Sequence, residues 1–257
     1  MKLRGYAALA LVCLGLLIAD PVQRFVIAPL ARLRPASRIR ILTRWMRANA
    51  WLVTRPLEVL GGARIPSPPP VVPAEPGVLI LMNHQSLFDI PLIVQAVEGG
   101  YPRIITRARY GRGIPLISHM TRLYQYPLVD PSANPGALRR TYRELREVAR
   151  TSTVPIAMFP EGSRTRDGRI RPFRRKGLEL LLRARPWRVY VLVVDGYWRW
   201  PRFKDFMRGI SGLRGRIELA GVLEWTDPRG DTDAFADEVR AMMVERLEAM
   251  RSGAGVA

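Results

Sequence analysis

Apolar residues along the chain fall into two patterns, short unbroken runs and longer stretches with helical spacing. The short runs predict buried strands, and the longer stretches predict amphipathic helices, in which apolar residues return every three or four positions. Strands are expected at Val78–Met82, Arg103–Thr106, Leu123–Val129, Val154–Phe159, Val189–Val194 and Arg216–Leu223. Helices are expected at Ser86–Val97, Pro135–Arg150, Phe173–Ala184 and Thr232–Met250.

Strands and helices alternate in this part of the chain, and such alternation predicts an α/β domain. We expect a mixed, mostly parallel sheet flanked by helices. In sheets of this kind the functional site lies where strands end and loops begin. Polar side chains that directly follow a strand are therefore the first candidates for chemistry.

The beginning of the chain has a different pattern, which is typical of membrane contact. Gly5–Ala19 contains no charge, and Asp20 and Pro21 end this run. A complete crossing needs about 20 apolar residues, so the run is short for a span. No small-x-small cleavage site follows it, which argues against a secretory signal peptide. Further on, basic and apolar residues alternate at helical spacing around Trp45 and Trp51, as in an interfacial helix.

Our hypothesis for residues 1–64 is therefore a membrane-associated helical segment, either one short tilted span or a re-entrant pair of helices. The competing interpretation is a helix that packs on the protein's own core. Basic residues are more numerous after the uncharged run than before it, so the positive-inside rule predicts that the rest of the chain lies on the cytoplasmic side of the cell membrane.

A proline-rich stretch predicts an extended linker over residues 65–76, because proline interrupts helices and central strands. Its prolines are Pro66, Pro68, Pro69, Pro70, Pro73 and Pro76. The α/β domain would then occupy residues 77–252.

The amino-acid composition excludes several classes of function for this chain. The 257 residues include 41 Lys and Arg against 22 Asp and Glu, a formal charge of +19, and 48% of them are hydrophobic, too many for a disordered chain. The basic charge indicates an anionic partner: nucleic acid, a phospholipid surface or a phosphorylated small molecule. One cysteine and two histidines exclude a disulfide framework within the chain and a cysteine- or histidine-rich metal site. The arginines are interleaved with aliphatic residues and no nucleic-acid-binding module is recognisable, which argues against nucleic acid.

A histidine and an aspartate follow the strand Val78–Met82, in the sequence N-H-Q-S-L-F-D at residues 83–89. Ser86 and Asp89 form a capping-box pattern, so we expect a helix to begin at Ser86, with Asp89 in its first turn and folded back toward His84. A carboxylate on one imidazole nitrogen fixes the tautomer, which leaves the other nitrogen as a general base. The structural alternative is a helix cap beside a hydrogen-bonded histidine, because this spacing is common by chance.

A second motif, F-P-E-G-S-R at residues 159–164, follows the strand Val154–Phe159. Glu161 is a carboxylate in the turn, and Arg164 is a candidate ligand for phosphate. Basic residues continue to Lys176 at the start of a helix, whose N-terminus itself favours anions. As a charge run alone, this segment would be a solvated or lipid-facing loop, but its position after a strand favours a phosphate pocket.

With these two motifs the chain resembles the glycerolipid acyltransferase family, over roughly Val71–Leu223. The resemblance implies transfer of a fatty acyl group from acyl-CoA or acyl-carrier protein to the free hydroxyl of a lysophospholipid. The acceptor it implies first is 1-acyl-sn-glycerol-3-phosphate, which would give phosphatidic acid. It implies no bound cofactor or metal, His84 as the general base and Asp89 as its orienting partner. It also implies a substrate-binding set of Glu161, Gly162, Ser163, Arg164 and Lys176.

The chain departs from the family's pattern in two places. The second family motif has an arginine that helps to hold the acceptor phosphate, and Pro131 stands at that position here, so that Arg122, Arg139 or Arg140 would have to substitute. The fourth motif is an apolar strand with a proline, and it reads V-L-V-V-D-G at residues 191–196, without the proline. The reaction type survives both departures, whereas the acceptor headgroup stays open.

The expected partners are therefore anionic membrane lipids, a lysophospholipid acceptor and an acyl carrier, and not nucleic acid. The alternatives are an acyltransferase for another lysolipid or a glycolipid, and a non-catalytic basic protein that binds lipid or nucleic acid.

Overall fold

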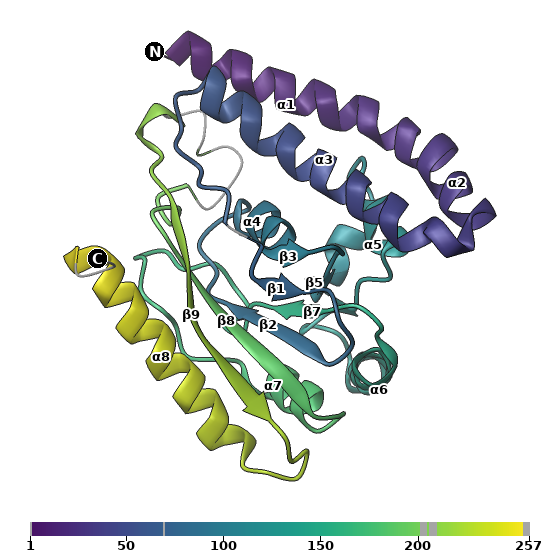
Figure 1. Ribbon diagram of the computed structural model, residues 1–257, viewed down its shortest axis with the longest axis vertical. Coiled ribbons are helices and arrows are strands. Elements are labelled where there is room, and N and C mark those ends of the chain that lie inside the picture. Colours follow the sequence, from purple (N-terminus) through teal and green to yellow (C-terminus); the bar gives the residue numbers. More distant parts are fainter. Residues whose placement is uncertain (1, 69, 201–204, 206–209, 254–257) are drawn as a thin grey trace.

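A computed structural model of the chain describes residues 2–68, 70–200, 205 and 210–253. Pro69 of the expected linker lies outside these residues. Helices cover both faces of a central sheet, and two long helices from the start of the chain lie together across one end of the molecule (Figure 1).

The central sheet has five strands in the order β4-β7-β2-β8-β9. These strands are β2 (Val78–Met82), β4 (Arg103–Ile104), β7 (Ile156–Met158), β8 (Trp187–Asp195) and β9 (Arg216–Trp225). The first four in sheet order are parallel and β9 is antiparallel to β8, which confirms the expected mixed, mostly parallel sheet. Alternate residues of β2 belong to two different apolar clusters, one on each face of the sheet.

Each face of the sheet is covered by its own set of helices. One cluster contains residues of α6 (Pro135–Thr151), α7 (Arg175–Leu182) and α8 (Thr232–Ser252). The other contains residues of α4 (Asp89–Ala96) and α5 (Ile117–Leu123). The four helices predicted from spacing are thus confirmed, with shifts at their ends.

Three predicted elements differ from the structure. The strand expected over Arg103–Thr106 is divided, because only Arg103–Ile104 joins the central sheet, whereas Thr106 pairs with Leu128 outside it. The helix expected from Ser86 begins at Asp89, because the Asp89 carboxylate accepts hydrogen bonds from the backbone of residues 85 and 86 and holds them in a loop. The strand expected over Leu123–Val129 is wrong for its first half, which lies in α5 and the turn after it. Only β6 (Leu128–Val129) is extended, and it pairs with β5 (Thr106–Arg107) outside the central sheet.

The remaining short elements connect the larger ones. In the proline-rich stretch, β1 (Val72–Pro73) pairs in parallel with β3 (Val97–Glu98). Three short 3-10 helices in the described residues are η2 (Pro35–Ser37), η3 (Ala108–Gly111) and η5 (Ile210–Gly212).

The N-terminal helix continues beyond the uncharged run. Helix α1 (Lys2–Val22) passes through a π-helical turn, η1 (Gln23–Ile27), into α2 (Ala28–Leu33), past Asp20 and Pro21, which end that run. Asp20 is accommodated because its carboxylate accepts from the Leu116 backbone N–H at 2.7 Å and from Arg24 at 2.9 Å. Helix α3 (Arg38–Val59) then returns beside α1, and α4 lies between this pair and the sheet (Figure 1).

One face of the α1 and α3 pair packs on the protein, and the other face is exposed. Its inner face shares one apolar cluster with α4 and β2. The helix Leu3–Leu33 is long and apolar enough to cross a membrane, and only 22% of its most apolar window is buried. Its exposed large apolar side chains include Leu3, Leu11, Leu14, Leu17, Ile18, Phe25, Val26 and Leu33. Length and composition therefore favour membrane association, without fixing the side on which the domain lies.

Candidate active site

His84 lies just beyond the carboxyl end of β2, and its ring is held from two sides. Nδ1 donates a hydrogen bond to Asp89 Oδ2 at 2.7 Å, and Phe159 stacks on the ring with a centroid distance of 4.1 Å. Asp89 is fully buried, whereas 17% of the His84 side chain is exposed, in the wall of a cavity. Because Nδ1 donates to a carboxylate, Nε2 is the ring nitrogen that can accept a proton.

The Asp89 carboxylate also organises the loop that carries His84. The same Oδ2 accepts from the backbone N–H groups of Gln85 at 2.6 Å and Ser86 at 2.8 Å. The first turn of α4 therefore fixes both the imidazole and the backbone next to it, as the sequence spacing predicts.

Neighbouring polar side chains clamp this loop to the end of β8. Asn83 donates to the Val194 carbonyl at 2.9 Å and accepts from the Val194 N–H at 2.8 Å. The Gln85 side-chain amide donates to Asp195 at 3.2 Å. The motif alone predicts no role for Asn83 or Gln85, although polar residues directly after a buried strand are the signal that points to them. The strand of the fourth motif thus holds the His84 loop, although this strand lacks the proline of the family's pattern.

Glu161 joins the two motifs from inside the protein. Its Oε1 accepts from the His84 backbone N–H at 2.7 Å, and its Oε2 accepts from the Arg171 N–H at 2.8 Å. The residue is 3% exposed, and burial raises its pKa to about 7 against the lowering effect of these two hydrogen bonds. The resemblance implies Glu161 among the substrate-binding residues, and in the structure its carboxylate holds the backbone N–H groups of His84 and Arg171.

The other residues of the predicted binding set line the same cavity as His84: Gly162, Ser163, Arg164 and Lys176. Gly162 has a φ of +66°, the left-handed region that favours glycine. The Ser163 hydroxyl accepts from Arg171 at 2.6 Å, and Lys176 pairs with Glu179 at 3.0 Å. The structure therefore brings both motifs to one wall.

This cavity has a volume of about 1260 Å³ and a lining that is part polar and part apolar. His84 and the basic residues of the second motif contribute to its polar lining. The apolar lining comes largely from α1, α3, α4 and α5 and includes Leu16, Met46, Val53, Phe88, Val94 and Ile117. Such a cavity suits a ligand with a long hydrocarbon part and a charged or polar end.

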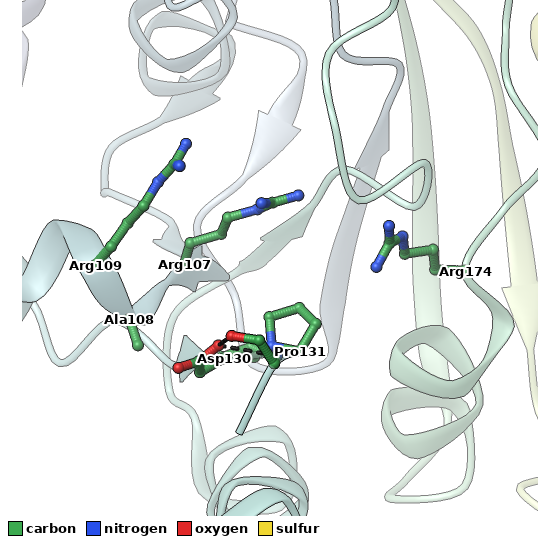
Figure 2. Close-up of a pocket in the computed structure, with 8 residues that line it drawn as sticks. Arg107, Ala108, Arg109, Asp130, Pro131 and Arg174 are labelled. Atoms are coloured by element: carbon green, nitrogen blue, oxygen red, sulfur yellow. Dashed lines mark hydrogen bonds between the residues drawn. The ribbon is translucent and has the colours of Figure 1, made fainter. Parts of the chain in front are cut away.

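A smaller cavity, of about 410 Å³, lies at the position where the sequence lacks the expected arginine. Its lining includes Pro131 and three arginines, Arg107, Arg109 and Arg174. Figure 2 shows the Arg107 and Arg174 side chains approaching this space from opposite sides, with Pro131 below and between them. The family's second motif has one arginine at this position. In this chain, arginines from two segments far apart in the sequence lie around it instead.

Arg107 and Arg174 also contact the turn of the second motif. Arg107 donates to the Gly162 carbonyl at 2.8 Å. A Cβ on residue 162 would lie 2.5 Å from Arg174 Cδ, so the glycine leaves the room that Arg174 occupies. The substitutes considered from the sequence lie elsewhere: Arg122 donates to the Gly111 carbonyl at 3.1 Å, and Arg139 and Arg140 are exposed on α6.

Within the described residues, no group of three or more His, Cys, Asp or Glu side chains is placed to hold a metal ion. The chemistry available here is that of an oriented imidazole in the wall of a cavity whose lining is largely apolar and includes several arginines.

Comparison with known proteins places the chain beside lipid acyltransferases. The family model described as Acyltransferase matches residues 67–195. A 1-acyl-sn-glycerol-3-phosphate acyltransferase from Cocos nucifera is 25% identical over 157 residues, which cover 61% of this chain and 46% of that protein. One from Limnanthes douglasii is 30% identical over 141 residues, which cover 55% of this chain and 49% of that protein. The match thus spans about half the length of these curated relatives.

A solved structure extends the likeness to almost the whole chain. The crystal structure of the 1-acyl-sn-glycerophosphate (LPA) acyltransferase PlsC from Thermotoga maritima aligns with a TM-score of 0.69 and 17% sequence identity. The alignment covers 96% of this chain and 98% of that one, so the N-terminal helix pair and the α/β domain belong to one shared fold.

Proposed function

The chain belongs to the Acyltransferase family, and we propose that it moves a fatty acyl group from acyl-CoA or acyl-carrier protein to the free hydroxyl of a lysophospholipid. The acceptor we propose is 1-acyl-sn-glycerol-3-phosphate, with phosphatidic acid as the product. One observation carries this proposal: His84, oriented by Asp89, lies in the wall of a cavity whose lining is largely apolar. The names of the curated relatives support the same acceptor.

In the proposed reaction His84 is the general base. Its Nε2 takes the proton of the acceptor hydroxyl as the oxygen attacks the thioester carbonyl carbon. The Asp89 carboxylate stabilises the imidazolium that forms and keeps the ring oriented. When the tetrahedral intermediate collapses, the carbon–sulfur bond breaks, and the imidazolium returns the proton to the thiolate. The new ester bond and the free thiol balance the reaction.

The arginines in the cavity lining support a phosphorylated acceptor. Arg164, Arg107 and Arg174 line the cavity together with His84, and the last two lie around Pro131. We assign the acceptor phosphate to these guanidiniums, because their planar donors bind phosphate oxygens in pairs. Gly162, Ser163 and Lys176 complete the polar wall, and the apolar interior is suited to the acyl chains.

The substrates of this reaction are membrane lipids, and the exposed apolar face of α1 and α2 is suited to reach them. We propose that this face enters the bilayer, that basic residues near it contact anionic headgroups, and that the α/β domain lies on the cytoplasmic side of the cell membrane.

The acceptor is tested by comparing lysophosphatidic acid with the monoacylglycerol that lacks its phosphate. A charge-assisted hydrogen bond contributes about 1.5–3 kcal/mol, so Arg164→Ala should lower kcat/KM for the phosphorylated acceptor by about 10–150-fold and matter less for the other. Arg164→Lys should restore only part of the loss. Equal losses on both acceptors would make Arg164 structural. A wild-type preference for the dephosphorylated acceptor would favour another lysolipid or a glycolipid.

A further inference from the structure

Four arginines form a stripe along α6. Arg139, Arg143, Arg146 and Arg150 follow one another at intervals of four, three and four residues, which places them on one side of a helix. All four are exposed. We call this set the arginine stripe.

Packing of α6 does not require the stripe. The helix is anchored by Leu145 and Ala149, which are buried on a different side. Arg150 pairs with Glu147 at 3.3 Å, but both side chains are more than half exposed, and pairs of this kind contribute little. Like charges three and four residues apart weaken a helix. Repulsion between the four arginines therefore destabilises α6, and no packing contact of the helix requires them.

The stripe runs beside the cavity that contains His84. Tyr142 and Leu145, from the same helix, line that cavity. Tyr142 comes three residues after Arg139, four before Arg146 and three before Leu145, so it lies at the edge of the stripe, between the stripe and the buried side of the helix. A partner that lies along the stripe would be next to the cavity.

The position of α6 favours a soluble partner over a lipid surface. In Figure 1, α1 lies across the top of the molecule and α6 lies toward the bottom, with α3 and α5 between them. The exposed apolar side chains are concentrated on α1 and α2. A bilayer that receives those side chains meets the side of the molecule away from α6.

We propose that the arginine stripe docks an acidic acyl carrier protein, which inserts its phosphopantetheine-linked acyl thioester into the cavity beside Tyr142. Acidic side chains on the carrier complement the four guanidiniums, and complementary charges of this kind raise association rates. Acyl-CoA carries the same thioester and arm but no protein surface, so it would reach the cavity without the stripe. The inference rests on the proposed acyl transfer and names its preferred donor.

The test compares two donors in one enzyme. Arg139, Arg143 and Arg146 are changed together to Gln, which is nearly as good a helix former. With palmitoyl–acyl carrier protein, kcat/KM should fall by about 10-fold or more at low ionic strength, and the loss should shrink at high salt. With palmitoyl-CoA, kcat/KM should stay within about twofold, which also reports that the variant is folded. The matched control changes Arg183, Arg188 and Arg229, exposed arginines outside both cavity linings, to Gln and should leave both donors unchanged.

Other outcomes overturn the inference. Equal losses with both donors, no loss with either, or a wild-type enzyme that uses only palmitoyl-CoA would each remove the docking role. Weaker binding to anionic vesicles with unchanged carrier kinetics would assign the stripe to lipid. If the wild type transferred palmitate from neither donor, the proposed function would fail. In that case, fluorescence anisotropy with labelled carrier protein would still decide whether the stripe binds it.

Discussion

Two carboxylates with different tasks surround His84. Asp89 accepts from the imidazole and from two backbone N–H groups, so it sets the direction of the ring. Glu161 accepts from the backbone of His84 and reaches across to Arg171, so it sets the position of the loop. The histidine is therefore fixed through both its side chain and its main chain before any substrate arrives.

Glu161→Gln should lower the melting temperature, because an amide nitrogen replaces one of two oxygens that accept from buried N–H groups. An unsatisfied buried donor costs about 1–3 kcal/mol. Thermal unfolding followed by circular dichroism checks this loss, with Glu144→Gln on the exposed surface of α6 as the control. Unchanged melting of the Glu161 variant would contradict the bridging role.

The same pair of proteins should differ in pH dependence. The folded-state pKa of Glu161 is raised from 4.5 to about 7, so the folded protein binds this proton more tightly than the unfolded chain. Its stabilising contribution is present below pH 4.5 and is lost as the pH rises through 7. The stability of the wild type relative to the Gln variant should fall across this window. A constant difference would show that Glu161 keeps its ordinary pKa.

Arg174 should take over the phosphate-binding role that the family's pattern gives to position 131. Arg174→Ala is expected to lower kcat/KM for lysophosphatidic acid about 10-fold or more, as for other charge-assisted contacts to phosphate. Adding Pro131→Arg to this variant should restore part of the activity, because the new guanidinium would line the same cavity. Steady-state kinetics on both variants checks whether an arginine at position 131 can replace Arg174. Loss without rescue would show that position 131 does not reach the phosphate, and no loss at all would leave the cavity without a role in acceptor binding.

The sequence predicts contacts in this site between residues close along the chain. It does not predict contacts between residues that only the folded structure brings together. His84 and Asp89 are separated by one turn, so the spacing alone brings them together. Arg107 and Arg174 come from different segments, and only the packing of both on the Gly162 turn places them around Pro131.

At the scale of elements, the buried strands were predictable because their apolar runs have little polar interruption. The ends of elements were less predictable, since single polar contacts decide them. The N-terminal helix continues past Asp20 because that carboxylate finds the Leu116 backbone N–H in another part of the chain.

Gln23 connects three elements and offers a direct test of how the helix pair is attached. It is fully buried, accepts from the Trp45 indole at 2.9 Å and donates to the Leu116 carbonyl at 3.2 Å, with His119 Nδ1 at 3.0 Å. Gln23→Leu should lower the melting temperature by several degrees, since about 1 kcal/mol corresponds to about 2–4 °C in a chain of this size. Phe25→Leu, at a position 77% exposed, is the matched control on the same helical turn and should change little. A variant as stable as wild type would show that Gln23 does not attach the helices.

At the scale of the whole molecule, the N-terminal helices have two roles in one arrangement. Their inner face closes the apolar cavity, and their outer face presents apolar side chains to the surroundings. The sequence pattern left membrane contact and core packing as alternatives for this segment, and the structure accommodates both because the two faces differ.

Membrane binding should depend on this outer face. The combined change Leu17→Ser, Ile18→Ser and Phe25→Ser removes three side chains that are 57%, 57% and 77% exposed. Flotation with anionic vesicles at high salt should show much weaker binding than wild type, because purely electrostatic attachment is screened there. Val222→Ser, an exposed apolar residue on β9, is the control. Full binding of the triple variant would place the attachment elsewhere.

The central claim is that His84, oriented by Asp89, removes the proton from the acceptor hydroxyl. Single-turnover acyl transfer to lysophosphatidic acid by folded His84→Ala protein, with donor and acceptor binding measured separately, tests it most directly. Turnover should fall by about 10²–10⁴-fold, the usual contribution of general base catalysis, while binding changes little. Asp89→Asn should also slow transfer, because it removes the charge that stabilises the imidazolium. Turnover near the wild-type rate in folded His84→Ala protein would contradict the account.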